Sequence, residues 1–240
     1  MNQLNKYLYP LFDHWFRGGN IFVYSDPHFS DPEMVYLRKD YIGDEEQIKR
    51  INSKVGKKDT IIFLGDIGNI DCIKKIRGYK VLIMGNHDSG KTNYQRVINE
   101  IQTFDSEEIS EEEKKEIVKR ASKMMLAGSL PPNADFSKYF RTKIEDNHLF
   151  DEVYEGPLMI NEKLMLSHEP LDLPPCIFNI YGHDHSSWFD NKGRGMNVCA
   201  EWINYTPISL LDFLKKGGLK DVDDIHRITI DRATERKNNK

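Results

Sequence analysis

Residues 60–66 read Thr-Ile-Ile-Phe-Leu-Gly-Asp, an apolar run that ends in a glycine and a carboxylate. Two further runs have the same form: IFVYS at 21–25 precedes Asp26-Pro27-His28, and YKVLIM at 79–84 precedes Gly85-Asn86-His87-Asp88. Short apolar runs rich in Ile, Val, Phe and Tyr are typical of buried β-strands. We therefore expect three buried strands, each followed by polar side chains that can bind a ligand.

The segments around these runs predict an alternation of strands and helices. Residues 44–55 begin with acidic residues and carry apolar residues at helical spacing, and a short helix is expected around 69–77. This order predicts an α/β layered domain. Strand-like runs return from residue 150 to 200, and their tight turns suggest an antiparallel part of the sheet system. A last helix is expected at 208–216, and residues 4–17 predict a short helix or a packed arm.

The segment between the third run and the returning strands differs in character. It is strongly charged, and Ser110-Glu111-Glu112-Glu113 forms a capping-box signature before EIVKRASKMML. We therefore expect a single domain over residues 1–240 with a helical insertion at about 92–148. One hypothesis is that the insertion covers the site and contributes to substrate choice. The alternative is a dimerisation element or an ornament packed elsewhere.

The bulk composition narrows the class of protein. A length of 240 residues allows one sizeable domain, and 39% hydrophobic and 30% charged residues fit a soluble globular protein. A net charge of −4 argues against a surface that coats nucleic acid. The three cysteines are far apart and form no CxxC pair, which favours a reducing cytoplasm over a disulfide framework. No run approaches the roughly 20 apolar residues of a membrane span.

Five short stretches gather the side chains that carry chemistry. They are Asp26-Pro27-His28, Gly65-Asp66, Gly85-Asn86-His87-Asp88, Ser167-His168-Glu169 and Gly182-His183-Asp184-His185. A single fragment of this kind is more often a turn or a helix cap, but five in order favour a metal site. Residues two apart in an extended segment point the same way, so Asp26 and His28 can bind one cation together. His183 and His185 can do the same or divide between two cations, and the Asp66 carboxylate can bridge them.

These motifs resemble those of the calcineurin-like metallophosphoesterase superfamily. The superfamily's small bacterial and phage-encoded phosphoesterases have segments similar to SDPHFSD, FLGDIGN, MGNHD, LSHEP and YGHDH. The resemblance covers residues of about 20–90 and 150–210, and the segment at 92–148 departs from the compact relatives. It implies a four-layer α/β/β/α sandwich with two divalent metal ions at the strand ends.

The resemblance also implies a role for each motif residue. Asp26, His28 and His185 would hold one metal ion, Asn86, His168 and His183 the other, and Asp66 would bridge them. Mn is the expected metal, and Fe, Zn, Ni and Mg also occur in the family. His87 resembles the family's catalytic histidine, and Asp88 would orient it, with a turn or helix-cap role as the alternative. Arg38 and Lys39 are expected on the solvated surface, with a place near the site as the alternative.

The implied function is hydrolysis of a phosphoester by a dinuclear metal centre in the cytoplasm. The substrate is expected to be a small or nucleotide-like phosphodiester or phosphomonoester, attacked in line by a hydroxide that bridges the metals. The first alternative is a nuclease acting on DNA or RNA, against which the weak basicity counts. The second is a non-catalytic metal-binding scaffold, which would have lost a ligand or the catalytic histidine, whereas every expected position is filled.

Overall fold

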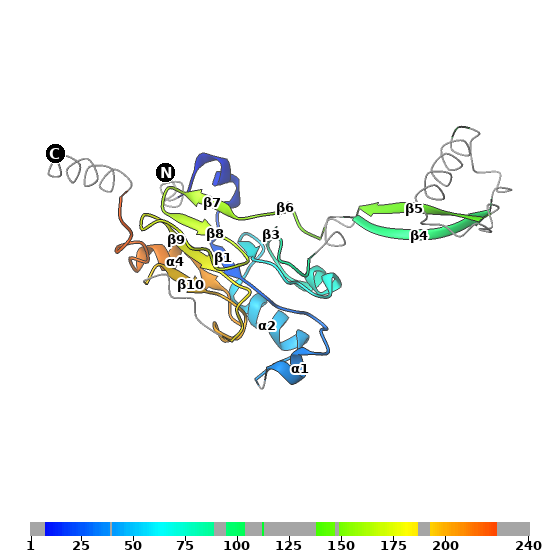
Figure 1. Ribbon diagram of the computed structural model, residues 1–240, viewed down its shortest axis with the longest axis horizontal. Helices are drawn as coiled ribbons and strands as arrows, with labels where there is room; N and C mark the ends of the chain where they lie inside the picture. The colour runs from blue at the N-terminus through cyan, green and yellow to red at the C-terminus, as the bar shows by residue number, and fades with distance from the viewer. Residues whose placement is uncertain are drawn as a thin grey trace, which may run out of the picture. The chain divides into compact units, whose positions relative to one another are not determined.

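The computed structural model describes residues 8–38, 40–88, 95–103, 112, 138–146, 149–186 and 193–224. The chain divides into two compact units (Figure 1). One unit comprises Met1–Asn93 and His148–Lys240, and the other comprises Tyr94–Asn147. All of the side chains predicted to bind metal lie in the first unit.

A five-stranded sheet runs through the first unit in the order β11-β1-β2-β3-β6. In that order the strands span Ile208–Ser209, Ile21–Tyr24, Thr60–Phe63, Tyr79–Ile83 and Glu152–Tyr154. All neighbouring strands are parallel except β11, which is antiparallel to β1. The three strands predicted from the apolar runs are confirmed. Because they are parallel, the polar residues that follow them meet at one edge of the sheet.

Two helical segments pack on one face of this sheet, α2 (Asp44–Lys54) and the 3-10 helix η3 (Ile70–Lys75). Successive strand residues point to opposite faces, so Phe22 and Ile61 join the apolar cluster that contains Ile51 of α2. Both predicted helices are confirmed. Among the described residues, no helix is long and apolar enough to cross a membrane.

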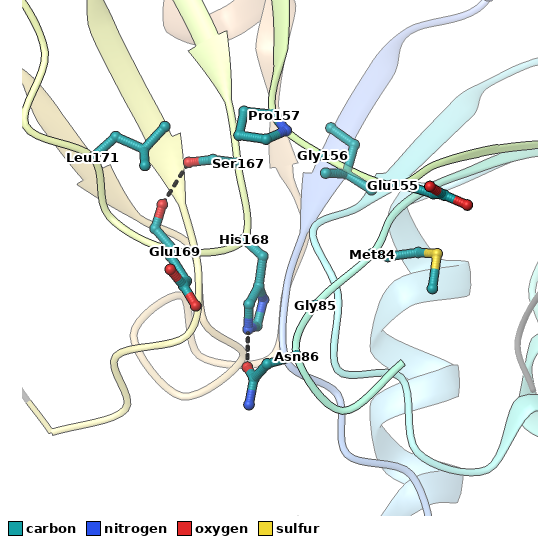
Figure 2. A pocket seen from close by; sticks show the side chains of 11 residues that line it. Met84, Gly85, Asn86, Glu155, Gly156, Pro157, Ser167, His168, Glu169 and Leu171 are labelled. Carbon is teal, nitrogen blue, oxygen red and sulfur yellow. Dashed lines mark hydrogen bonds between the residues drawn. The ribbon is translucent and has the colours of Figure 1, made fainter. Parts of the chain in front are cut away.

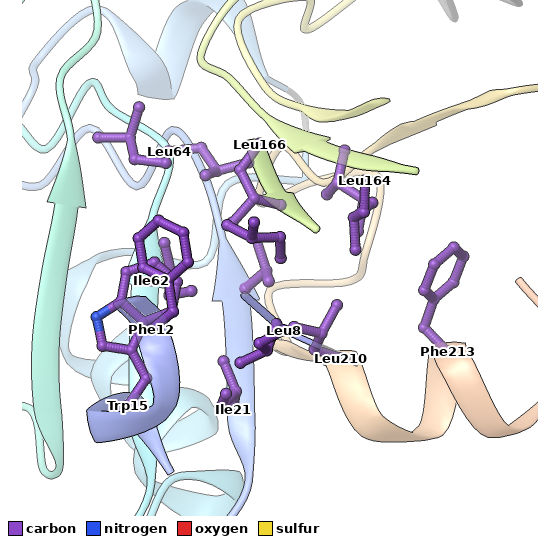
Figure 3. Packing of buried hydrophobic residues seen from close by; sticks show 14 of the residues in the cluster. Leu8, Phe12, Trp15, Ile21, Ile62, Leu64, Leu164, Leu166, Leu210 and Phe213 are labelled. Atoms are coloured by element: carbon purple, nitrogen blue, oxygen red, sulfur yellow. The ribbon is translucent and has the colours of Figure 1, made fainter. Parts of the chain in front are cut away.

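A four-stranded sheet in the order β10-β9-β8-β7 faces the other side. In that order its strands span Gly195–Asn197, Phe178–Tyr181, Leu164–Leu166 and Leu158–Asn161. Figure 3 shows Ile21 and Ile62 of the first sheet in the same cluster as Leu164 and Leu166 of the second. Burial of each such side chain contributes about 1.5–3 kcal/mol. This apolar layer therefore fixes the two sheets, and the loops at their ends, against one another.

The remaining short elements close the same core. The 3-10 helix η2 (Pro10–Trp15) buries Phe12 and Trp15, which confirms a short helix within the predicted residues 4–17. Helix α4 (Leu210–Lys215) begins at Ser209, whose hydroxyl accepts a hydrogen bond from the Asp212 amide at 3.0 Å. The helix predicted at 208–216 is confirmed. The four-residue helix α1 (Met34–Leu37) lies between the β1 loop and α2.

The prediction of an antiparallel second half is wrong for most of its strands. Among the described strands from β6 to β10, only β7 and β8 pair antiparallel, whereas β8 with β9, β9 with β10, and β3 with β6 pair parallel. Parallel neighbours need a crossover connection rather than a tight turn. The connection after β8 carries the His168 stretch, and the connection after β9 carries the His183 stretch.

The second unit corrects the prediction of a helical insertion. Strands β4 (Gln95–Thr103) and β5 (Lys138–Asp146) pair antiparallel along their whole length, from Gln95 opposite Asp146 to Thr103 opposite Lys138. Both segments contain β-branched and aromatic residues that favour strands, a signal that the abundant charges obscured. Of the residues between them, the structure describes only Glu112, which is helical. The other residues predicted as helix lie outside the described ranges.

Candidate metal centre

The predicted ligands come together at the carboxyl ends of strands from both sheets. Asp26 and His28 follow β1, Asp66 follows β2, and Asn86 follows β3 in the first sheet. His168 follows β8 in the second sheet, and His183 and His185 follow β9. The Asp26 carboxylate joins the two sheets because its Oδ2 accepts a hydrogen bond from the His183 amide at 2.9 Å.

Four side chains form a first group of potential metal ligands. Asp26 Oδ1 lies 3.6 Å from His185 Nε2 and 4.0 Å from His28 Nε2, which in turn lies 3.6 Å from Asp66 Oδ2. Asp26 is fully buried and Asp66 is 2% exposed. Within the described part of the chain, Asp26 Oδ1 and His28 Nε2 are buried without a hydrogen-bond partner. Two buried polar atoms that lie 4.0 Å apart without hydrogen-bond partners fit a cation between them.

A second group shares the Asp66 carboxylate. His168 Nε2 lies 3.5 Å from Asp66 Oδ2 and 2.8 Å from Asn86 Oδ1. His183 Nδ1 lies 3.1 Å from both Asn86 Oδ1 and His168 Nε2. Imidazole nitrogens, an amide oxygen and a carboxylate oxygen form a mixed donor set that suits a divalent ion. The described residues thus include His and Asp groups that could hold a metal ion on either side of Asp66.

In His28 and His168, the ring nitrogen that faces away from the centre contacts another group of the protein. His28 Nδ1 lies 3.2 Å from Asp31 Oδ2, and His168 Nδ1 lies 2.7 Å from the Leu64 carbonyl oxygen, to which it donates its proton. Both rings therefore present Nε2 to the centre, as ligating histidines usually do. Asp31 was not among the predicted site residues, and its place three positions after His28 was the only signal for it.

Cys199 is a second residue that the sequence did not suggest. Its Sγ lies 3.3 Å from Asp26 Oδ2, which also accepts a hydrogen bond from the Ser25 hydroxyl. Burial raises the pKa of the Cys199 thiol, and the nearby Asp26 charge raises it further. The sulfur therefore stays protonated and acts as a donor to Asp26, although it also lies close enough to His185 to belong to a potential ligand group.

Burial also changes the pKa of the His28 imidazole. Desolvation lowers the pKa of its imidazole, and the charge of Asp26 offsets this only in part. A lowered pKa favours the neutral ring, which is the form that binds a metal ion.

The backbone at the ligands is strained. Asp26, His28, Asp66 and His183 have φ angles of 54°, 44°, 51° and 67°, in the left-handed region that non-glycine residues rarely adopt. Each costs on the order of 1–2 kcal/mol. Gly65 has a φ of 93° and allows the turn before Asp66, and a Cβ there would lie 2.7 Å from His168 Nδ1. Such strain at ligand positions is typical of a functional site.

His87 and Asp88 occupy different environments. The His87 ring is 68% exposed, with Nε2 3.9 Å from Asp66 Oδ2, so it lies at the open side of the centre. Asp88 is buried, and its carboxylate accepts backbone hydrogen bonds from Asp66 at 2.7 Å, Gly85 at 2.9 Å and Ile67 at 3.0 Å. These bonds tie the β2 loop to the β3 loop and correspond to the turn role weighed for Asp88. Orientation of His87 by Asp88 stays a prediction.

Arg38 corrects a prediction. Instead of lying on the solvated surface, it is 8% exposed, and its guanidinium contacts His185 and Glu201. The residue follows helix α1, and its contact with His185 places its guanidinium at the β9 loop. A basic residue in the short segment after the His28 motif gave no signal of burial. Lys39 lies outside the described residues.

A cavity of about 260 Å³ adjoins the second ligand group. Its walls come from the ends of β3 and β8 and from the turn between β6 and β7. Figure 2 shows Asn86 and His168 pointing toward one another at one side, with Pro157 and Leu171 at the other. The cavity therefore opens beside the Asn86 and His168 side chains.

Comparisons with known proteins bear on the fold alone. No family model matches the chain, and no curated protein matches it. The crystal structure of a protein of unknown function from Aquifex aeolicus, AQ665, matches with a TM-score of 0.51 and 20% sequence identity. The match covers 82% of this chain and 98% of that one. It agrees with a mixed α/β fold that contains two parallel-rich sheets.

Proposed function

We propose that this chain is a dinuclear metal-dependent phosphoesterase of the calcineurin-like metallophosphoesterase superfamily, with its four-layer α/β/β/α sandwich. The observation that carries the proposal is the Asp66 carboxylate, whose Oδ2 lies 3.6 Å from His28 Nε2 and 3.5 Å from His168 Nε2, one in each ligand group. A helical layer and two facing sheets support the fold assignment.

The donor set fits two divalent ions. Asp26, His28 and His185 would hold one, Asn86, His168 and His183 would hold the other, and Asp66 would bridge them. The buried, unpartnered atoms Asp26 Oδ1 and His28 Nε2 support this occupancy. When bound, such a pair supplies a nucleophile at neutral pH and neutralises charge on phosphoryl oxygens. We expect Mn, with Fe, Zn, Ni and Mg as alternatives, because mixed oxygen and nitrogen donors do not select one of them.

We assign separate roles to His87, Asp88 and the cavity. His87, exposed and 3.9 Å from Asp66, would donate a proton to the leaving oxygen of the ester or stabilise charge on the phosphate. Asp88 holds the loop that carries both Asn86 and His87. The cavity beside Asn86 and His168 would take one organic group of the ester.

The proposal is tested by removing metal with a chelator and restoring Mn²⁺, Fe²⁺, Zn²⁺, Ni²⁺ or Mg²⁺, each in a separate sample. Turnover is then measured on bis-p-nitrophenyl phosphate, p-nitrophenyl phosphate, a cyclic nucleotide and single-stranded DNA. We expect metal-dependent hydrolysis of at least one of the small esters, and the Glu162→Ala variant, altered at an exposed carboxylate of the β7–β8 turn, should match the parent protein. Cleavage of DNA alone would favour a nuclease. No turnover with any of the five metals would refute the proposed enzymatic activity and favour a non-catalytic scaffold.

A further inference from the structure

We infer that Glu201 and Arg38 are positioning residues for His185. They hold its ring with the proton on Nδ1, the nitrogen that faces away from the metal site. The inference rests on the proposed metal centre. Glu201 Oε1 lies 2.7 Å from His185 Nδ1. A carboxylate can only accept a hydrogen bond, so this contact places the proton on Nδ1. The lone pair is then on Nε2, which lies 3.6 Å from Asp26 Oδ1.

Arg38 forms an ion pair with Glu201, whose carboxylate contacts the His185 ring. Its Nη1 lies 3.1 Å from Glu201 Oε2, and the side chains of the two residues are 6% and 20% exposed. A buried guanidinium needs an anionic partner, and Glu201 supplies one. The opposite oxygen of Glu201 stays free to bond His185, so one carboxylate serves both the arginine and the histidine.

The contacts of Arg38 with His185 require a choice between two arrangements. Arg38 Nη2 lies 2.7 Å from His185 Nδ1 and 3.1 Å from Nε2. One ring nitrogen cannot donate to Glu201 and also accept from Arg38, and both partners lie 2.7 Å from Nδ1. The carboxylate bond decides the tautomer because a carboxylate and a bare Nδ1 lone pair would repel each other. The guanidinium then lies beside the ring as the counter-ion of Glu201.

Backbone contacts connect these residues to neighbouring elements. Arg38 is the residue at which α1 ends, and its amide donates to the Met34 carbonyl at 2.9 Å. Arg38 Nη1 also approaches the Asp26 carbonyl oxygen at 3.4 Å. Glu201 follows the bridge between Ser25 and Cys199, and this links it to the end of β1. The three side chains thus come from three loops that meet at the first ligand group.

Residues that orient a ligating histidine from behind raise the affinity for its metal ion about 10- to 100-fold. The same geometry holds His28 through Asp31, but Glu201 differs because an arginine fixes its second oxygen. Loss of Glu201 should therefore weaken one metal site and leave the ligands around His168 and Asn86 in place.

The experiment is a calorimetric titration of Mn²⁺ into chelator-stripped full-length protein, together with ¹⁵N NMR of the His185 ring. We expect Glu201→Ala to weaken one of two binding events about 10- to 100-fold. Glu201→Gln, which keeps an acceptor oxygen, should recover part of this loss, and Arg38→Gln should lose less than Glu201→Ala. Glu162→Ala, at an exposed carboxylate of the β7–β8 turn, serves as the matched control and should not change the affinity.

The NMR spectrum of the parent protein should show the proton on Nδ1 of His185. A proton on Nε2, or unchanged Mn²⁺ affinity in both Glu201 variants, would overturn the inference. His185→Ala separates this failure from that of the proposed function. If His185→Ala weakens Mn²⁺ binding and the Glu201 variants do not, the metal centre stands without the positioning role. If the parent protein binds no Mn²⁺, both ideas fail.

Discussion

Two carboxylate clusters lie in the first unit and differ in what completes them. At the start of β6, Glu152 Oε1 accepts hydrogen bonds from His14 at 2.6 Å, Tyr79 at 2.8 Å and Trp15 at 3.0 Å, and Oε2 accepts one from Tyr154. Burial raises the pKa of Glu152, but these donors outweigh it and leave the pKa below its usual value. The protein itself supplies every partner that this carboxylate needs.

The carboxylates of the candidate metal centre are different. Asp26 is fully buried, yet its Oδ1 has no hydrogen-bond partner among the described residues, and Asp66 Oδ2 faces the Nε2 atoms of His28 and His168. Imidazoles turned toward a carboxylate by their outer bonds can accept a cation between them. Hydrogen-bond donors complete the Glu152 cluster, whereas the second cluster faces imidazole nitrogens and could hold a metal ion.

Replacing the shared carboxylate should give the largest effect. Asp66→Asn removes the charge between the two ligand groups, and we expect loss of both metal ions and a fall in kcat on the order of 10³-fold. Elemental analysis and turnover of the best small ester measure the two quantities. Full metal content in this variant would contradict the bridging role.

His87→Ala should separate chemistry from metal binding. Because His87 is exposed and belongs to neither ligand group, metal content should stay unchanged while kcat falls about 10²- to 10³-fold. The measurement compares kcat with bound metal in the same preparation. A variant as fast as the parent protein would refute the assigned role of His87.

Added metal should stabilise the fold through the candidate centre alone. At 100 times its dissociation constant, Mn²⁺ binding at one site contributes about 2.7 kcal/mol to the free energy of unfolding. Urea denaturation with and without Mn²⁺ measures this gain, which Asp66→Asn should abolish and Glu152→Gln should keep. Equal stabilisation of the two variants by Mn²⁺ would contradict the proposal that only the candidate centre binds metal.

Glu152→Gln should give the smallest effect and one that depends on pH. Loss of charge-assisted hydrogen bonds should cost about 1–2 kcal/mol of unfolding free energy at pH 7. The pKa of Glu152 is lower in the folded chain than in the unfolded one, so its contribution is present above the unfolded pKa and is lost as the pH falls through the folded value. The parent protein and the variant should therefore converge in acid. Urea denaturation in chelator across this pH range, with Glu155→Gln as the exposed control, tests the convergence.

The parts of the fold that periodicity encodes were predictable. The runs before Asp26, Asp66 and Asn86 form strands, and their parallel pairing brings those residues to one edge. The parallel pairing of β8, β9 and β10 was not predictable, because short strands look alike whichever direction they pair. Strands β4 and β5 were mistaken for helix because charge outweighed the β-branched residues in the pattern.

The side chains that gather at the candidate centre were predictable because each belongs to a compact motif. The residues that hold them were harder to find because their partners are distant in sequence. Glu201 and His185 are separated by 16 positions, and Cys199 and Asp26 by 173. A buried arginine such as Arg38 leaves no mark in local sequence, since its burial depends on a carboxylate that only the fold brings near.

Anomalous diffraction at the manganese edge, from crystals of the protein grown with Mn²⁺, tests the central claim most directly. The account predicts two peaks, one on each side of Asp66 Oδ2, the first beside Asp26, His28 and His185 and the second beside Asn86, His168 and His183. No peak at Asp66, or peaks confined to other parts of the chain, would contradict it.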